Sequence, residues 1–147
     1  MNQDTVEEQL KQLLPKSLDD IVRENRDQLR LALATEEELK RLQTTLPDAS
    51  FRHSLTQWDI LMLHVTEGDR KVSSPRLIGK LSESGESWMT SHVVSIDTEH
   101  GLVQTRNSMY RIIGPRAEEK DLDLLRICGA LHEWGLGKHF GVPPIFY

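Results

Sequence analysis

The sequence lacks the features that would place it in several common classes of protein. Cys128 is the only cysteine among 147 residues, so no disulfide can form within the chain. No apolar run reaches the length of about 18 residues that a membrane-spanning helix needs. The chain begins M-N-Q-D-T-V-E-E, which is polar and acidic, whereas a secretory signal starts basic and continues apolar. These absences predict a protein of the reducing cytosol, in the cytoplasm and without a membrane partner.

Motifs for catalysis and cofactor binding are also missing. Cys128 and His132 lie one helical turn apart, but zinc sites usually take their ligands from two such pairs. The stretch H-E-W-G-L-G-K-H has neither the spacing of the H-E-x-x-H zinc motif nor that of a phosphate-binding loop. No G-x-S-x-G elbow is present for a serine nucleophile. We therefore expect no metal, no cofactor and no catalytic residue, and the sequence favours a protein that is not an enzyme.

Charge is in excess on the acidic side, and it is unevenly distributed. The chain has 18 Lys and Arg residues against 23 Asp and Glu residues, which gives a net charge of −5. Residues 68–116 form the one long stretch in which basic residues outnumber acidic ones. A nucleic-acid-binding surface usually shows a stronger concentration of basic residues. The excess in this stretch is too small to establish such a surface by itself.

Residues 1–67 are predicted to be mainly helical, because apolar residues recur there at helical spacing. Pro15 and Pro47 would end the first and the third of these helices, since proline disfavours helical geometry in the residue before it. The stretch T-E-E-E, which starts at Thr35, is a capping box and favours the start of a helix. Three amphipathic helices are expected, at residues 5–14, 17–33 and 35–46.

The stretch at residues 54–67 allows two interpretations. S-L-T-Q, from Ser54 to Gln57, has the pattern of a second capping box and favours a helix that ends near Gly68. The apolar run from Trp58 to Val65 is also short enough to be a buried strand. We favour the helix here and keep the strand as the alternative.

Residues 76–114 have the composition of a small antiparallel meander. Four short runs rich in β-branched and aromatic residues alternate with turn-forming clusters. A last helix at residues 120–136 and a strongly apolar tail complete the C-terminal part, residues 118–147. The sequence therefore predicts one α+β domain, residues 1–147, in which an N-terminal helical layer and a C-terminal helix pack on a four-stranded antiparallel meander. The strands are expected at residues 77–81, 88–96, 102–106 and 109–113.

One part of this meander resembles other proteins. From Trp88 to Ile112 the chain reads W-M-T-S-H-V-V-S-I-D-T-E-H-G-L-V-Q-T-R-N-S-M-Y-R-I. It is similar to a hairpin pattern of small uncharacterised bacterial proteins encoded by phages, plasmids or genomic islands, in which T-S-x-V-x-x-I-D is followed by V-x-T-x-x-S-x-Y-x-L. The resemblance implies a bacterial, mobile-element origin. It implies no catalytic or binding residue.

Two functions are compatible with these observations. The first is a small acidic protein that works by binding another protein, as an inhibitor, an immunity-type protein or an accessory factor. The second is a regulator that binds nucleic acid through the basic hairpin at Arg106 and Arg111, where arginines flank an aromatic residue. The large side chains of the apolar tail are costly to leave in water, so we expect them to lie in a groove of this protein, with contact to a partner or to a second copy of the chain as the alternative. The candidate binding residues are Arg76, Lys80, Arg106, Tyr110, Arg111, Phe146 and Tyr147.

Overall fold

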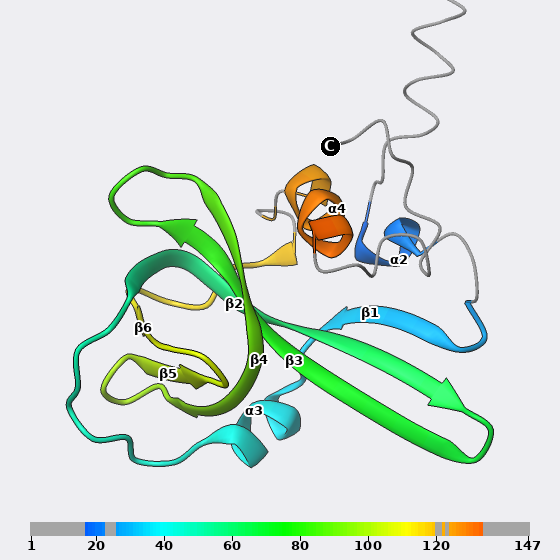
Figure 1. Ribbon diagram of the computed structural model, residues 1–147, viewed down its shortest axis with the longest axis horizontal. Coiled ribbons are helices and arrows are strands. Elements are labelled where there is room, and N and C mark those ends of the chain that lie inside the picture. Colours follow the sequence, from blue (N-terminus) through cyan, green and yellow to red (C-terminus); the bar gives the residue numbers. More distant parts are fainter. Residues whose placement is uncertain (1–16, 23–25, 120–121, 123, 134–147) are drawn as a thin grey trace, which may run out of the picture.

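The structure is a computed structural model that describes residues 17–22, 26–119, 122 and 124–133, and it consists mainly of one antiparallel sheet (Figure 1). Neighbouring strands pair in sequence order, and β2 also pairs in parallel with β6, with His53 opposite Tyr110. This last pairing closes β2 to β6 into a barrel and leaves β1 outside, along β2. The strands are β1 (Leu29–Leu33), β2 (His53–Glu67), β3 (Arg70–Leu81), β4 (Ser87–Asp97), β5 (Leu102–Thr105) and β6 (Met109–Ile112). The helices are α2 (Leu18–Ile21), α3 (Glu36–Leu42) and α4 (Leu124–Glu133).

The hairpin of β2 and β3 is far longer than the barrel requires. The two strands have 15 and 12 residues, whereas β5 and β6 have four each. Gly68, with a φ of +60°, allows the tight turn between them. The distal part of the hairpin, residues 63–74, extends away from the barrel with β1 beside it (Figure 1). We call residues 63–74 the arm.

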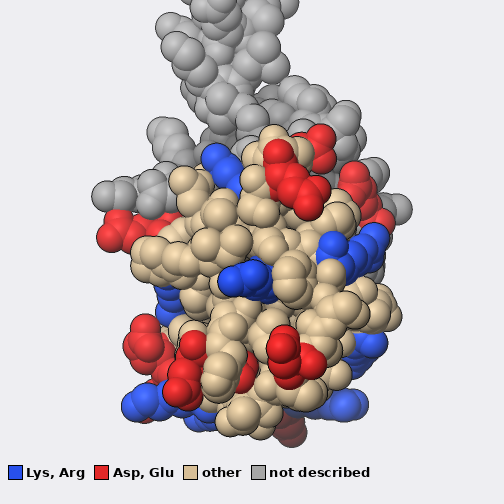
Figure 2. All heavy atoms as spheres, turned by 90° about the vertical axis from the view of Figure 1, so that its left-hand side faces the viewer, with Lys and Arg blue, Asp and Glu red and all other residues tan. Residues whose placement is uncertain are grey.

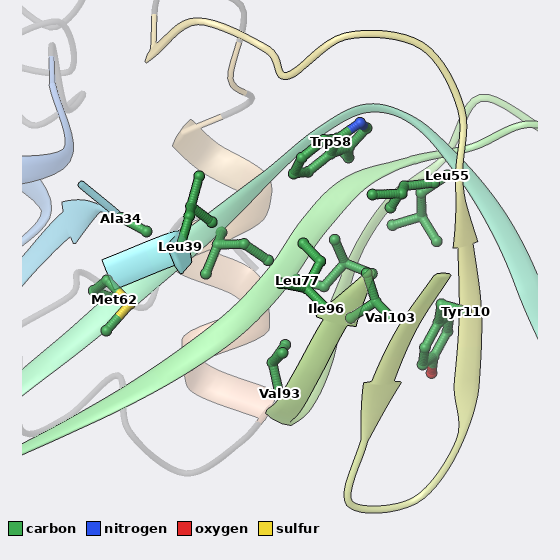
Figure 3. Packing of buried hydrophobic residues seen from close by; sticks show 12 residues of the cluster. Ala34, Leu39, Leu55, Trp58, Met62, Leu77, Val93, Ile96, Val103 and Tyr110 are labelled. Carbon is green, nitrogen blue, oxygen red and sulfur yellow. The ribbon is translucent and has the colours of Figure 1, made fainter. Parts of the chain in front are cut away.

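Two hydrophobic clusters lie on opposite sides of β2. One fills the barrel and is covered at one end by α3 (Figure 3). The other lies between the outer face of β1, β2 and β3 and the helices α2 and α4. β2 is therefore buried on both faces, which is unusual for an antiparallel strand. The barrel cluster consists of Ala34, Leu39, Leu55, Trp58, Ile60, Met62, Leu77, Val93, Ile96, Val103, Tyr110 and Ile112.

An irregularity in β2 bends the sheet where the barrel closes. The pairing with β3 shifts between Thr56 and Asp59, and Gln57 between them has a φ of +47°. Gly79 of β3 lies against this bulge, and a Cβ atom there would lie 2.9 Å from the carbonyl oxygen of Thr56. A glycine inside a strand is typical of such a close approach between two backbones.

The predicted fold is wrong in its main feature, which is the N-terminal helical layer. The four predicted strands are present as β3 to β6, but residues 29–33 and 53–67 add two more strands from the part expected to be helical. Among the described residues up to Glu67, helix is confined to α2 and α3. The helix start at Thr35 is confirmed, because the Thr35 and Glu38 side chains accept hydrogen bonds from each other's backbone N–H groups. The predicted helix at residues 5–14 and the apolar tail lie outside the described residues.

The physical reason for this error is the burial of β2 on both faces. Residues 60–63 are all buried, alternately in the two clusters, so the alternation that identifies a strand disappears from the sequence. β1 does alternate, because Leu29, Leu31 and Leu33 share one face and contact the outer cluster. Leu29 and Leu33 are also four residues apart, which is the spacing of one face of a helix. This coincidence made the stretch look helical in the sequence.

Candidate functional site

The structure brings two of the predicted binding residues, Arg76 and Arg106, together around a histidine. Arg76 of β3 lies opposite His92 of β4, and the backbone N–H of Arg106 donates to the carbonyl of His92 at 3.0 Å. Val93 and Thr105, the residues next to His92 and Arg106, are buried, so the side chains of His92 and Arg106 lie on the outside of the barrel. We call Arg76, His92 and Arg106 the basic row. It crosses three neighbouring strands where β3 and β4 separate.

Hydrogen bonds hold part of the basic row in place. Arg76 donates from Nε to the Ser74 hydroxyl at 3.3 Å and from one terminal nitrogen to the Thr90 carbonyl at 3.4 Å. The Ser74 hydroxyl lies 2.9 Å from His92 Nδ1. The Ser74 hydroxyl therefore links Arg76 to His92, and it can donate to Nδ1 or accept from it, according to which ring nitrogen of His92 carries the proton.

Burial and neighbouring positive charge lower the pKa of two members of the basic row. Burial lowers the pKa of His92, and the charges of Arg106 and Arg76 lower it further. Burial also lowers the pKa of the half-buried Arg76, again with a contribution from Arg106.

A second feature lies beside the basic row, along the outer edge of the arm. β3 pairs with β4 only from Arg76 onwards, so no described strand pairs with the outer side of residues 70–75. We call this side the β3 edge. Its residues 70–73 are exposed, including Val72, which is 47% exposed. Unpaired strand edges are sites where another chain can add a strand.

The direction of the backbone groups on the β3 edge follows from the bonds made on the other side of β2. Thr66 N–H donates to the Gln28 carbonyl at 2.7 Å, so the even-numbered residues of β2 bond toward β1 and the odd-numbered ones bond toward β3. The N–H and C=O groups of Lys71 and Ser73 consequently point outward. Pro75 is the next residue in this series, and it has no N–H to leave unpaired.

The other predicted residues do not join the basic row. Lys80 lies opposite Ser87 and lines a mainly apolar hollow beside α4. Tyr110 is only 3% exposed, inside the barrel, with its ring 6.5 Å from that of His53 (Figure 3). Arg111 is exposed, and its guanidinium carbon lies 5.8 Å from the centre of the Phe51 ring, a cation–π contact. Phe146 and Tyr147 lie outside the described residues.

The charges on the face seen in Figure 2 are mixed in sign. Basic and acidic side chains are interspersed among uncharged ones, and neither sign forms a continuous patch on this face. A surface that binds long nucleic acid is normally lined by basic residues. This face therefore does not have that character.

Sequence reasoning missed a buried ion pair, which we call the Asp59 junction. Arg116 donates from Nε to Asp59 Oδ1 at 2.6 Å, and also to the carbonyl of Ala34 and to Glu36 Oε1, the last at 3.5 Å. The Ile60 N–H donates to the same oxygen of Asp59 at 2.7 Å. The junction therefore ties the bulge of β2 to the segment before α3 and to the chain that follows β6. Burial raises the pKa of Asp59 more than these bonds lower it.

A signal for the Asp59 junction was present in the sequence. Asp59 stands inside the apolar run W-D-I-L-M-L, and a buried carboxylate needs a partner. The partner, Arg116, is 57 positions away along the chain, so no local pattern identifies it.

A third polar cluster closes the hairpin between β4 and β5. Asp97 is 3% exposed and accepts hydrogen bonds from the backbone N–H groups of Leu46 and His100, at 3.0 and 3.1 Å. Its Oδ2 lies 2.8 Å from Nδ1 of His100. The bond from Leu46 is the main reason that the pKa of Asp97 is lowered, and the bond to Asp97 is the main reason that the pKa of His100 is raised. All partners are internal, so this cluster has a structural role.

Comparisons with known proteins add no relative to this description. No family model matches the chain, and neither curated proteins nor solved structures give a significant match. Within the described ranges, no three His, Cys, Asp or Glu side chains gather so that they could hold a metal ion. Over the same residues, no helix combines the length and the apolar character needed to cross a membrane.

Proposed function

We propose that the protein acts by binding another protein, and that the β3 edge is the surface that makes the contact. The observation that carries this proposal is the row of unpaired backbone groups at Lys71 and Ser73, on an arm that extends beyond the barrel (Figure 1). An extended segment of the partner would add as a further strand, with main-chain hydrogen bonds supplying affinity. An inhibitory, immunity-type or accessory role would act through this contact.

The charge of the β3 edge indicates the kind of segment that binds. Arg70 and Lys71 are exposed at its start, and Arg76 lies at its end. Two copies of this edge would repel each other, and basic residues and proline are common means of preventing strands from pairing with their own kind. An acidic segment of a different protein would be attracted. The exposed side chain of Val72 would give it one apolar contact.

A pair of variants at Ser73 tests the proposal. Ser73→Pro removes the outward N–H and places a ring on the edge, whereas Ser73→Ala keeps the N–H. Both variants lose the contact of the Ser73 hydroxyl with His64 Nδ1 at 2.7 Å. The difference between them is therefore the backbone N–H group on the β3 edge. The tagged full-length chain is used to capture proteins from extracts of the source cells, and the captured protein is then purified and its affinity measured by calorimetry.

We expect the same acidic protein to bind the wild type and Ser73→Ala with equal affinity, and Ser73→Pro at least tenfold more weakly. Thermal unfolding confirms that each variant is folded. If Ser73→Pro does not fold, Lys71→Pro and Lys71→Ala form an equivalent pair. Equal binding to a folded proline variant, or the absence of any captured protein that depends on the edge, would contradict the proposal.

A further inference from the structure

The hollow beside α4 is a second surface of the molecule, and it does not include the β3 edge. Its lining comes from β2, β3, β4, α4 and the segment before α4, and it is mainly apolar. The hollow has a volume of about 40 Å³. One water needs about 10–15 Å³, so there is room for a branched apolar side chain and not for a cofactor. The apolar residues of the lining are Ile78, Trp88, Met89, Leu122, Ile127 and Ala130.

One polar group in this lining lacks a partner. The indole Nε1 of Trp88 is buried, and no hydrogen-bond acceptor for it lies in the described part of the chain. The ring itself has neighbours, because the guanidinium carbon of Arg52 lies 5.6 Å from its centre and the ring of His53 packs edge-on at 5.0 Å. Nearly all buried N–H groups in proteins are paired, since an unpaired one destabilises the fold. An acceptor from beyond the described residues would remove this cost.

We infer that residues 142–146 of the same chain, V-P-P-I-F, dock in the hollow beside α4. These residues lie outside the described ones, and three of the five side chains are large and apolar. Packing them on the lining removes apolar surface of both partners from water. The two prolines favour the extended polyproline conformation, whose carbonyl groups make no hydrogen bonds within the segment. Such segments dock on aromatic side chains, and their carbonyl groups can accept from an indole N–H.

The position of the hollow favours a segment of the same chain over one from another molecule. Ala130 lines the hollow from the last turn of α4, which ends at Glu133. A helix rises 1.5 Å per residue, so Glu133 lies only about 5 Å further along the axis. Residues 134–141 connect it to the docking segment and can span up to about 26–29 Å. So short a connection gives the segment an effective concentration in the millimolar range.

NMR spectra of the unmodified full-length chain give the most direct test. We expect nuclear Overhauser contacts between the ring protons of Trp88 and the methyl groups of Val142 or Ile145. We also expect these contacts to keep their strength on dilution, because docking occurs within one molecule. The absence of the contacts would overturn the inference. Contacts that weaken on dilution would assign the segment to the hollow of a second copy, and that result would overturn it as well.

Two double variants of the full-length chain measure what the apolar side chains contribute. Ile145→Ser with Phe146→Ser removes two of them, whereas Lys138→Ser with His139→Ser changes two polar residues of the same tail. The first double variant should shift the indole N–H signal of Trp88, and the second should leave it in place. Equal shifts in both would contradict the inference. If the first double variant does not fold, the contacts in the unmodified chain still decide the question.

A peptide restores the missing segment from outside. Synthetic residues 138–147, added to the variant with Ile145→Ser and Phe146→Ser, should bind saturably and return the Trp88 signal to its wild-type position. A peptide that carries the same two serines should bind at least tenfold more weakly. The inference is overturned if the wild-type peptide produces no saturable shift, or if both peptides bind equally well.

Discussion

The arginines of the Asp59 junction and of the basic row differ in the charge of the groups around them. At the junction Arg116 contacts a buried carboxylate, a carbonyl and a second carboxylate, so its charge is compensated inside the protein. In the row Arg76 and Arg106 lie on either side of His92, and the charges of both lower the pKa of that histidine. The comparison shows that the same side chain serves as the partner of a buried carboxylate in one place and as a cation beside a histidine in the other.

The largest expected effect is at the junction. Arg116→Ala leaves Asp59 as a buried charge without its cation, and we expect it to lower the free energy of unfolding by about 3–5 kcal/mol. Glu36 is the outer partner of the same arginine, and its side chain is 84% exposed. Glu36→Gln should therefore lower the free energy of unfolding by less than about 1 kcal/mol. Urea unfolding of both variants measures the two values.

A double variant sharpens this result. Asp59→Asn keeps an oxygen for the Ile60 N–H but removes the charge, so adding it to Arg116→Met should restore part of the lost stability. If the double variant loses as much free energy of unfolding as the two single variants lose together, the two side chains are not coupled, and the ion pair does not hold the junction.

A smaller effect of opposite sign is expected at the basic row. Arg106→Gln removes a positive charge that lowers the pKa of both Arg76 and His92, and it should raise the free energy of unfolding by less than about 1 kcal/mol at low salt. The gain should disappear in 1 M sodium chloride, because salt screens exposed charges over about 3 Å at that concentration. Destabilisation by Arg106→Gln at low salt would show that the row is a compensated structural cluster like the junction.

The smallest effect is expected at His100, whose exposed imidazole contacts the buried carboxylate of Asp97. The raised pKa of His100 means that its charged form stabilises the folded state, and this contribution is complete below its ordinary pKa of 6.5 and declines as the pH rises through the folded value. The lowered pKa of Asp97 keeps that partner ionised down to about its ordinary value of 3.8. The melting temperature of His100→Asn should therefore fall furthest below that of the wild type between these two pH values. A difference that grows above pH 7 would contradict the assignment.

Local sequence patterns predicted the features that depend on neighbouring residues. The capping box at Thr35 is present, and so are the four strands of the predicted meander. The two additional strands depend on what covers β2, since a strand buried on both faces loses its alternation. Composition alone carries no information on which faces will be covered.

Only two members of the basic row were predictable from the sequence, and their grouping was not. Arg76 and Arg106 were recognised as basic residues of the sheet, but the grouping with Arg111 and Tyr110 assumed that residues near one turn share one surface. Tyr110 instead faces the interior of the barrel, in line with the period-2 alternation of β6. His92 was missed because only the register of β3 with β4 places it between the two arginines.

The parallel pairing of β2 with β6 also has a consequence for how the chain folds. His53 and Tyr110 are adjacent in space but separated by 57 positions, so the barrel closes only after all the strands between them have been made. Loop-closure entropy must be overcome before this contact contributes, and such non-local pairings slow folding. The arm is a local hairpin that can form early. We expect substitutions at the seam between β2 and β6 to act on the folding rate, and those at the tip of the arm to act on local opening.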